Sequence, residues 1–199
     1  MHEEKAASKK KVNRKLQIVA AAEKLLREKG LVGVTTRAIA AAVPCSEGAI
    51  YVHFSGRLEL LLAVLEASLP EMLIPLHALD SEIGRKTPEQ NMIKAVQGLR
   101  KFHTRVVPML SSLLAEPELL SGFRESMAKR GGGPNGGIAR IRNYIAAEQS
   151  LGRLSGDIDA EQVAVTLMSV SFFQAFTSGL FGRQVPSWNP ARMVKSLLR

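Results

Sequence analysis

Hydrophobic residues recur with the spacing of an α-helix along most of the chain. Ile18, Ala22 and Leu25 follow i, i+4 and i+7, and they predict a helix from about residue 12 to residue 29. Gly30 follows, a residue that tolerates the positive φ common at helix ends. No stretch alternates with a period of two over a useful length, and no hairpin turn signal lies between apolar runs. The pattern therefore predicts an all-α protein of nine to ten helices.

Two short helices around a tight corner are expected next. Thr35 can cap the first helix, because its hydroxyl accepts a backbone N–H that lacks a partner, and Pro44 ends that helix. Ser46 can cap the second helix in the same way. The inward residues of the second helix are Ile50 and Phe54, which lie four residues apart on one face.

The remainder of the chain is expected to form a larger helical body, punctuated by prolines. We expect Pro70 and Pro75 to kink or end the fourth helix, and Pro108 and Pro117 to bracket a short apolar helix. Residues 131–137, GGGPNGG, are expected to be a flexible loop. Helices are expected from near Arg57, from Pro88 to about Val107, after Pro117, from Ile138 to about Ser150, from Asp157 or Asp159 to about Leu180, and from about Pro190 to Leu198.

The helix expected to end near Leu180 carries apolar residues around most of its circumference. Such a helix needs partners on two sides, and we expect one to be the chain's own core and the other a second copy. Residues 162–182 lack charge and could span a bilayer by length, but their Thr, Ser and Gln residues favour a buried helix. The expected dimer interface comprises Val163, Leu167, Val170, Phe173, Met193 and Leu197.

Composition narrows the class of protein. Hydrophobic residues make up 46% of the 199 residues and charged residues 23%, which suits a soluble protein with a buried core. The single cysteine, Cys45, excludes an internal disulfide and a cysteine-rich metal site, and it fits a reducing compartment. The N-terminal residues contain no apolar run of the kind found in signal peptides, so we expect a cytoplasmic protein.

Positive charge is concentrated near the N-terminus. Residues 1–57 hold 11 Lys and Arg against 5 Asp and Glu, so they contribute +6 of the formal net charge of +9. A basic end on a nearly balanced body is typical of proteins that bind polyanions. Residues 1–12 have no apolar periodicity and are expected to be a flexible basic arm. This arm either contacts phosphates or is only a solvated tail.

Residues around the corner match a known pattern. The helix AAAEKLLREKG is followed by Thr35, Ile39-Ala40, Ser46-x-Gly48-x-Ile50-Tyr51-x-His53-Phe54 and Arg57. Through these residues, the segment 14–63 resembles the DNA-binding domain of the TetR family of bacterial transcriptional regulators. The chain departs from the family at Val43-Pro44-Cys45, where Ala-Gly-Val is usual. The departure affects the backbone of the corner, because proline forbids the positive φ that glycine permits.

The resemblance implies a three-helix helix-turn-helix domain followed by a larger domain for ligand binding and dimerisation. The basic arm of residues 1–12 then precedes a DNA-binding domain at residues 13–56, and residues 57–199 form the larger domain. Helix N-termini and small or amphipathic side chains suit contacts to phosphates and to a groove. Contacts to operator DNA are expected from Thr35, Thr36, Arg37, Ser46, Glu47, Gly48, Ala49, Tyr51, His53 and Arg57.

The resemblance also implies a homodimeric repressor of a palindromic operator, released by a small molecule. The helix near Arg57 would join the DNA-binding head to the ligand-binding body. The effector is expected to be apolar or aromatic and held by polar groups of His103 and Tyr144, with no metal or other cofactor. The pocket is expected among Met72, Phe102, His103, Met109, Leu113, Phe123, Met127, Tyr144, Phe172 and Phe176.

Two other functions remain open at this stage. A non-specific nucleoid-type DNA-binding protein would explain the basic end, although pure phosphate binding needs no large apolar body. A helical enzyme would need clustered acid–base or metal-binding residues, and the four histidines show no ligand spacing. The glycine-rich stretch is not followed by Lys-Ser or Lys-Thr, so it does not match a phosphate-binding loop.

Overall fold

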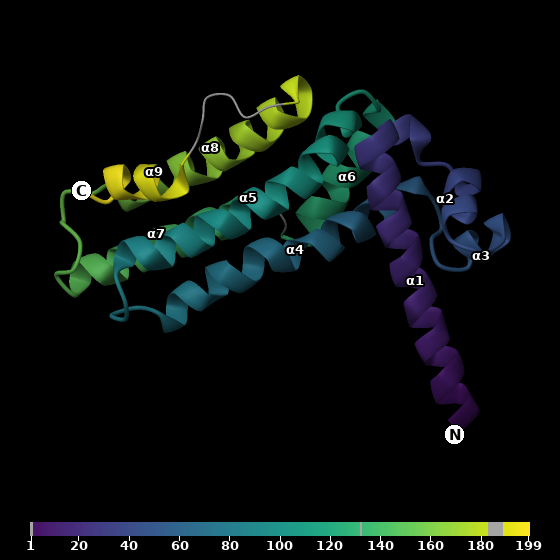
Figure 1. Ribbon diagram of the computed structural model, residues 1–199, viewed down its shortest axis with the longest axis horizontal. Helices are drawn as coiled ribbons and strands as arrows, with labels where there is room; N and C mark the ends of the chain where they lie inside the picture. Colours follow the sequence, from purple (N-terminus) through teal and green to yellow (C-terminus); the bar gives the residue numbers. More distant parts are fainter. Residues whose placement is uncertain (1, 132, 183–188) are drawn as a thin grey trace. The chain divides into compact units, whose positions relative to one another are not determined.

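The computed structural model describes residues 2–131, 133–182 and 189–199, with side chains from residue 14 onward. All regular structure in these ranges is helical (Figure 1), so the prediction of an all-α fold is confirmed. The elements are α1 (His2–Lys29), the 3₁₀ turn η1 (Leu31–Gly33), α2 (Thr36–Ala42), α3 (Glu47–Tyr51), α4 (Arg57–Ser81), α5 (Pro88–Leu113), α6 (Pro117–Lys129), α7 (Asn135–Ser150), α8 (Ala160–Phe181) and α9 (Pro190–Leu197).

The chain forms two compact units. The N-terminal unit comprises the residues up to Ala67 together with Pro108–Glu125, and the C-terminal unit comprises Ser68–Val107 and Ser126–Arg199. The N-terminal unit includes the first turns of α4, the end of α5 and most of α6 together with the three N-terminal helices. A functional domain boundary after residue 56 stays a prediction.

Helix α1 begins at His2, well before the expected start near residue 12. The added residues are rich in alanine, lysine and glutamate, which lose little side-chain freedom in a helix. Extending an existing helix also avoids the cost of a new nucleus. In its described part, α1 buries Ile18 and Ala22 completely, as the apolar spacing predicted. A role for the first residues in contacting phosphate stays a prediction.

The corner between α2 and α3 is built without glycine. α2 ends at Ala42, and Val43 adopts an extended conformation with φ −119° and ψ 116°, which every L-residue can reach. The Val43 side chain is buried. The Pro44 carbonyl accepts a hydrogen bond from Nη1 of Arg14 at 3.2 Å, which ties the corner to α1. The departure from the family pattern therefore needs no strained residue at this turn.

Prolines do not divide the helical body as expected. α4 continues through Pro70 and Pro75 to Ser81, and α5 continues through Pro108 to Leu113. A proline in a helix costs roughly 3 kcal/mol by losing a hydrogen bond and crowding the preceding turn. The expectations of a helix end at Pro70 or Pro75 and of a new helix after Pro108 were wrong, because packing of long apolar faces outweighs this local cost. Opposite Pro75, Gly98 leaves room: a Cβ there would lie 2.3 Å from the proline Cγ.

The glycine-rich stretch is only partly a loop. α7 begins at Asn135, so the last residues of the expected loop are helical. Gly137 is buried in α7, where an added Cβ would lie 2.7 Å from Cε of Met168 on α8. The expectation of a loop through residue 137 was wrong because this glycine permits the close packing of α7 against α8.

Helix α8 separates a buried face from an exposed aromatic face. Asp159 caps its start by accepting from the backbone N–H of Gln162 at 2.9 Å, and Gly182 ends it with a left-handed φ of 66°. Ala164 and Leu167 are fully buried, while Phe173 is 50% exposed. By length and hydropathy α4 and α8 could each cross a membrane, and 44% of the most apolar window of each is buried in the chain.

Candidate nucleic-acid interface

Side-chain caps begin both helices of the corner. The Thr35 hydroxyl accepts from the backbone N–H of Ala38 at 3.1 Å, and the Ser46 hydroxyl accepts from that of Ala49 at 3.2 Å. Each cap satisfies one of the donors that a helix N-terminus leaves without an intrahelical partner. Both expected caps are therefore present, and they fix where α2 and α3 start.

One side of α3 is buried and the other is exposed. Ile50 is 3% exposed and packs into the N-terminal unit together with Phe54, whereas Tyr51 is 62% exposed. Glu47 and Gly48 lie on the exposed side. The Lys15 ammonium lies 5.3 Å from the centroid of the Phe54 ring. This cation–π contact joins α1 to the segment that follows α3. The exposed side is small and polar apart from one aromatic ring.

A hydrogen bond joins the first turns of α2 and α3. The Thr36 hydroxyl donates to Oε2 of Glu47 at 2.6 Å. This bond holds the Glu47 carboxylate in place at the exposed start of α3. A carboxylate repels phosphate, but it can accept from the amino group of cytosine in a major groove. The sequence had assigned both residues to the interface without predicting that they bind each other.

A hollow of about 500 Å³ lies in the N-terminal unit between η1, the start of α2, the end of α3 and the start of α4. Four of the expected DNA contacts line it, namely Thr35, Thr36, Tyr51 and Arg57. Arg37 lies exposed in the first turn of α2, and His53 is half-buried with its ring 6.5 Å from that of Phe54. The structure thus gathers most of the expected residues around one corner, with Ala49 half-buried among them.

Arg57 is engaged inside the N-terminal unit. Its guanidinium donates to the Leu31 carbonyl through Nη2, and its Nη1 lies 3.8 Å from a carboxylate oxygen of Glu116. Arg57 thereby links the start of α4 to η1 and to the residue before α6. Sequence reasoning missed Glu116, because a partner that lies 59 positions away along the chain leaves no local signal.

A second contact missed from the sequence caps α4. Glu59 accepts from the Ser55 backbone N–H at 2.7 Å and from the Ser55 hydroxyl at 2.8 Å. The backbone hydrogen bond first, and then the hydroxyl, lower the pKa of Glu59. Glu59 lies four residues after Ser55, one more than in a capping box, so the capping-box spacing does not predict this contact.

The expected pocket residues are divided between the two units. Met109, Leu113 and Phe123 belong to the N-terminal unit, and the other seven belong to the C-terminal unit. Met72, Phe102, Met109 and Leu113 are buried, Phe123 and Met127 are half-buried, and Phe172 and Phe176 are each 39% exposed. The role of these residues in effector binding stays a prediction.

His103 is buried among aromatic rings of the C-terminal unit. Its Nδ1 lies 2.9 Å from the Ser171 hydroxyl, and its ring makes an edge contact with Phe172 at 5.7 Å between centroids. Burial lowers the pKa of His103 to about 4, so the ring is neutral near pH 7. The Phe172 ring stacks in turn against Phe176 at 6.4 Å.

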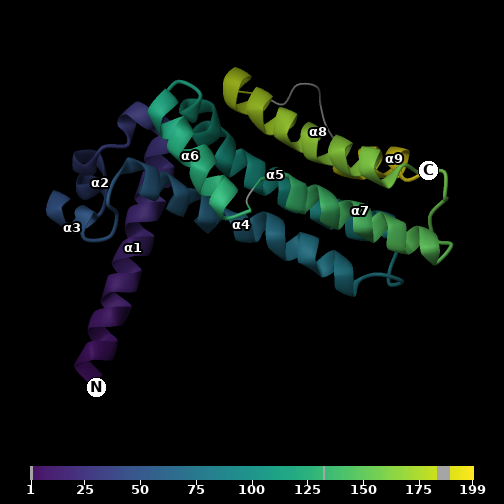
Figure 2. The same cartoon turned by 180° about the vertical axis from the view of Figure 1, so that it is seen from behind.

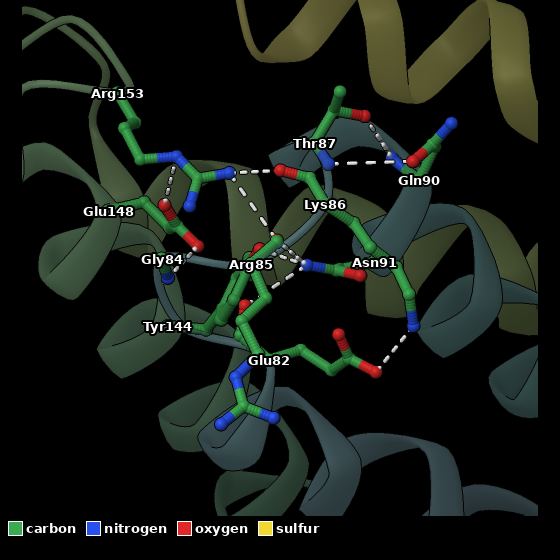
Figure 3. Close-up of polar contacts among 10 residues, drawn as sticks. All are labelled: Glu82, Gly84, Arg85, Lys86, Thr87, Gln90, Asn91, Tyr144, Glu148 and Arg153. Carbon is green, nitrogen blue, oxygen red and sulfur yellow. Dashed lines mark hydrogen bonds and ion pairs between the residues drawn. The ribbon is translucent and has the colours of Figure 1, made fainter.

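Tyr144 belongs to a network that fastens the loop between α4 and α5 to α7 (Figure 3). Asn91 donates to the Tyr144 hydroxyl at 3.0 Å and to the carbonyls of Glu82 and Arg85 at 3.3 and 3.0 Å. Burial raises the pKa of Tyr144 to about 12. Because its hydroxyl is bonded within this network, the tyrosine holds the loop in position.

A buried ion pair completes the same network. Glu148 is fully buried; it accepts from the Gly84 backbone N–H at 3.1 Å and lies 3.2 Å from Nε of Arg153. Arg153 also donates to the carbonyls of Arg85 and Lys86 (Figure 3). Oε2 of Glu148 has no hydrogen-bond partner among the described residues, so its ion pair with Arg153 offsets the cost of burying the charge. These contacts account for the buried charge as a structural feature of the C-terminal unit.

The expected dimer residues differ in how much surface they present. Val163 and Leu167 are 6% and 0% exposed, so they are buried within the chain, whereas Phe173 is half-exposed. Val170, Met193 and Leu197 are of intermediate exposure. The large exposed apolar residues on α8 also include several that were not expected in the interface, namely Val165, Phe172, Phe176, Leu180 and Phe181.

Comparison with known proteins agrees with this geometry. Residues 18–64 match a family described as bacterial regulatory proteins, tetR family. No curated protein sequence is significantly similar to the chain. The resemblance inferred from the motif is thereby confirmed for the segment that carries it.

Several solved structures are similar to the chain over nearly its whole length. One is a TetR transcription regulator from Haloarcula marismortui, with 16% identity, a TM-score of 0.64, and coverage of 94% of this chain and 93% of that one. Another is the fatty acid degradation regulator FadR from Bacillus halodurans, with 16% identity, a TM-score of 0.62 and 92% of each chain covered. A tetR-family regulatory protein from Rhodococcus RHA1 has 21% identity, a TM-score of 0.59 and coverage of 94% and 95%. At these identities the likeness shows the fold.

Proposed function

The N-terminal domain of this chain belongs to the TetR family of bacterial regulatory proteins, and from this premise we propose that the chain is a ligand-responsive transcriptional repressor. It binds a palindromic operator in the cytoplasm as a homodimer and leaves the operator when a small molecule binds. The family match and the fold support a DNA-binding regulator.

The observation that carries the proposal is the exposed side of α3. A helix of only five residues has little stability of its own, so it persists because Ile50 is buried and Ser46 caps it. This support leaves Glu47, Gly48 and Tyr51 exposed. Glycine allows close approach to a groove, and the tyrosine ring can pack on sugar while its hydroxyl bonds a phosphate. A rigidly held, exposed helix of this kind suits insertion into a major groove.

The exposed aromatic face of α8 supports the homodimer. Phe173 is 50% exposed and Phe181 61% exposed. Aromatic side chains left in water on one helix mark an interface, because their burial contributes roughly 25 cal/mol per Å². A two-fold dimer buries the same face from each copy. It also presents two α3 helices to successive major grooves, about 34–36 Å apart.

Release by an effector requires a route from the larger domain to α3. α4 passes from the N-terminal unit into the C-terminal unit, so a shift of this helix changes both. Arg57, at the first position of α4, binds the Leu31 carbonyl and faces Glu116 next to α6. We infer that movement of α4 or α6 breaks these contacts and changes the separation of the two α3 helices. An effector can shift this balance only by its difference in affinity for the two arrangements.

A footprinting experiment on the DNA upstream of the gene that encodes this chain tests the proposal. The purified protein should protect a short palindrome at moderate salt, and the protection should weaken as salt rises because phosphate contacts release counterions. Protection of one short site supports the repressor. Uniform coating of the DNA would support a non-specific nucleoid-type protein instead, and absence of binding even at low salt would contradict both.

A further inference from the structure

A second hollow, of about 560 Å³, lies in the C-terminal unit between α4, α5 and α8. Both views of the fold show α5 running between α4 and α8 (Figures 1 and 2). α4 contributes Glu71 and α5 contributes Arg100, Lys101 and Arg105. None of these four was expected to bind an effector. The volume falls within the range that small-molecule sites occupy.

Charge in this hollow is unbalanced. Arg105 and Glu71 form an ion pair, with Nη1 and Oε1 2.8 Å apart. Arg100 and Lys101 line the same hollow and are exposed. Three cations therefore face one carboxylate, which leaves a surplus of two positive charges. A concave surface with charge of one sign concentrates the field and attracts a small ion of opposite charge.

Helical geometry makes this surplus costly without a ligand. Lys101 and Arg105 are four residues apart, so they are neighbours on one face of α5, and like charges at this spacing destabilise a helix. Glu71 offsets the charge of Arg105. An anion bound between Arg100 and Lys101 would offset the remainder. The guanidinium of Arg100 can hold an oxyanion through two parallel N–H donors.

Small side chains on α8 keep the hollow open. Ala175 and Ser178 form its wall on this helix. Gln174 lies beside them and is 5% exposed. Phe172 and Phe176, on the same helix, do not line the hollow. The hollow is therefore a polar, positively charged site whose α8 wall consists of small side chains, and it is distinct from the aromatic face of α8.

The other hollow shows the contrast. In the N-terminal unit, Arg57 is the single cation of the lining and Glu116 the single carboxylate, so their charges balance. The wall of that hollow is otherwise formed largely by apolar residues such as Val32, Ile39 and Leu60. This hollow therefore has no surplus positive charge among its lining residues. Only the hollow in the C-terminal unit combines an open cavity with unbalanced positive charge, among the two described.

We propose that the hollow between Arg100, Lys101 and Ser178 binds a small organic molecule through an oxyanion, either a carboxylate or a phosphate. The role of this site in releasing DNA rests on the function proposed above. The binding of an anion at this site does not depend on that function. The proposal adds an anionic group to the apolar or aromatic effector expected from the sequence.

Calorimetry on the full-length protein tests the binding. Inorganic pyrophosphate and benzoate, each titrated at constant ionic strength, distinguish a phosphate from a carboxylate ligand. At least one should bind with a Kd below about 1 mM. The double variant Arg100→Gln/Lys101→Gln should weaken binding by about tenfold or more, because a charge-assisted hydrogen bond is lost. The matched double variant Arg140→Gln/Arg142→Gln removes the same charge elsewhere on the unit and should leave binding unchanged.

A second variant separates the site from general charge. Ser178→Phe places a large ring in the wall and should block binding without changing the net charge. Failure of both probes to bind at about 10 mM overturns the site, as does equal weakening in the two double variants. Operator affinity, measured by fluorescence anisotropy with and without the bound probe, decides the effector role separately. A loss of operator affinity supports it, and unchanged affinity overturns that role alone.

Discussion

Two exposed helical faces of this protein have opposite chemistry. α3 exposes Glu47, Gly48 and one aromatic ring, Tyr51, whereas α8 exposes a row of aromatic and aliphatic side chains that includes Phe173 and Phe181. Both faces lie in water in the single chain. A hydrated, charged DNA groove suits the first face, and another protein surface of apolar residues suits the second.

The way each helix is held differs as well. α3 is five residues long and depends on the cap of Ser46 and the burial of Ile50. α8 is 22 residues long and buries a continuous face that includes Ala164 and Leu167. The contrast teaches that exposure alone does not identify a partner. The composition of the exposed face is the better guide to the partner.

The largest expected effect is on the aromatic face of α8. Changing Phe173 and Phe176 together to Glu should leave a monomer and weaken operator binding by about 10²–10⁴-fold, because linked binding to the second half-site is lost. Analytical ultracentrifugation and DNA anisotropy measure the two effects. Leu151→Glu, at a residue 54% exposed elsewhere on the same unit, is the control and should change neither. A dimer that survives the double change would place the interface on another face.

The buried imidazole of His103, which contacts Phe172 on this face, should make the stability of the fold depend on pH. His103 has a folded pKa of about 4, below its ordinary value of 6.5, so the unfolded chain binds more protons between these values. Stability therefore falls as pH decreases through this window, by about 2 kcal/mol between pH 7 and pH 5. Urea unfolding at the two pH values measures the loss. His103→Gln should reduce that loss, and an unchanged loss in the variant would assign it to other groups.

Loss of the aromatic ring of α3 should have a smaller effect, confined to DNA. We expect Tyr51→Ala to weaken operator binding by about tenfold with the dimer and the melting temperature unchanged, because the side chain is 62% exposed. Tyr51→Phe keeps packing on sugar and removes only the phosphate bond, so its loss should be partial. Unchanged operator affinity in Tyr51→Ala would show that α3 does not enter the groove.

The smallest expected effect concerns the cap of α3. Ser46→Ala removes the hydroxyl that accepts from the Ala49 backbone N–H, and it should lower the free energy of unfolding by about 1 kcal/mol. Ser150→Ala is the matched control, since its hydroxyl bonds a carbonyl within α7 rather than capping a helix. Its effect should stay within about 0.5 kcal/mol. Equal losses in the two variants would show that the cap does not stabilise the start of α3.

Local chemistry made parts of the fold predictable. Caps were expected from Thr35, from Ser46 and from either Asp157 or Asp159. Thr35, Ser46 and Asp159 cap their helices, because a cap depends on a hydroxyl or carboxylate within three residues of its donor. The burial of Ile50 and Phe54 followed from their spacing on one helical face. The caps and the buried residues of the corner could therefore be predicted from the sequence alone, while its contacts to DNA stay a prediction.

Prediction failed where packing outweighed local preference. Pro75 and Pro108 lie inside helices, although proline disfavours such positions, and Gly137 lies in α7 rather than a loop. The space that Gly98 leaves opposite Pro75 can be recognised only when α4 and α5 are seen together.

The sequence by itself determined the all-α class, the caps and the small exposed face of α3. These features depend on residues close together in the chain, where periodicity and side-chain chemistry act directly. Only the tertiary structure decided that Arg57 faces Glu116 and that Arg100 and Lys101 share a hollow with residues of α8. Such pairs are separated by tens of residues, so they meet only after the helices have packed.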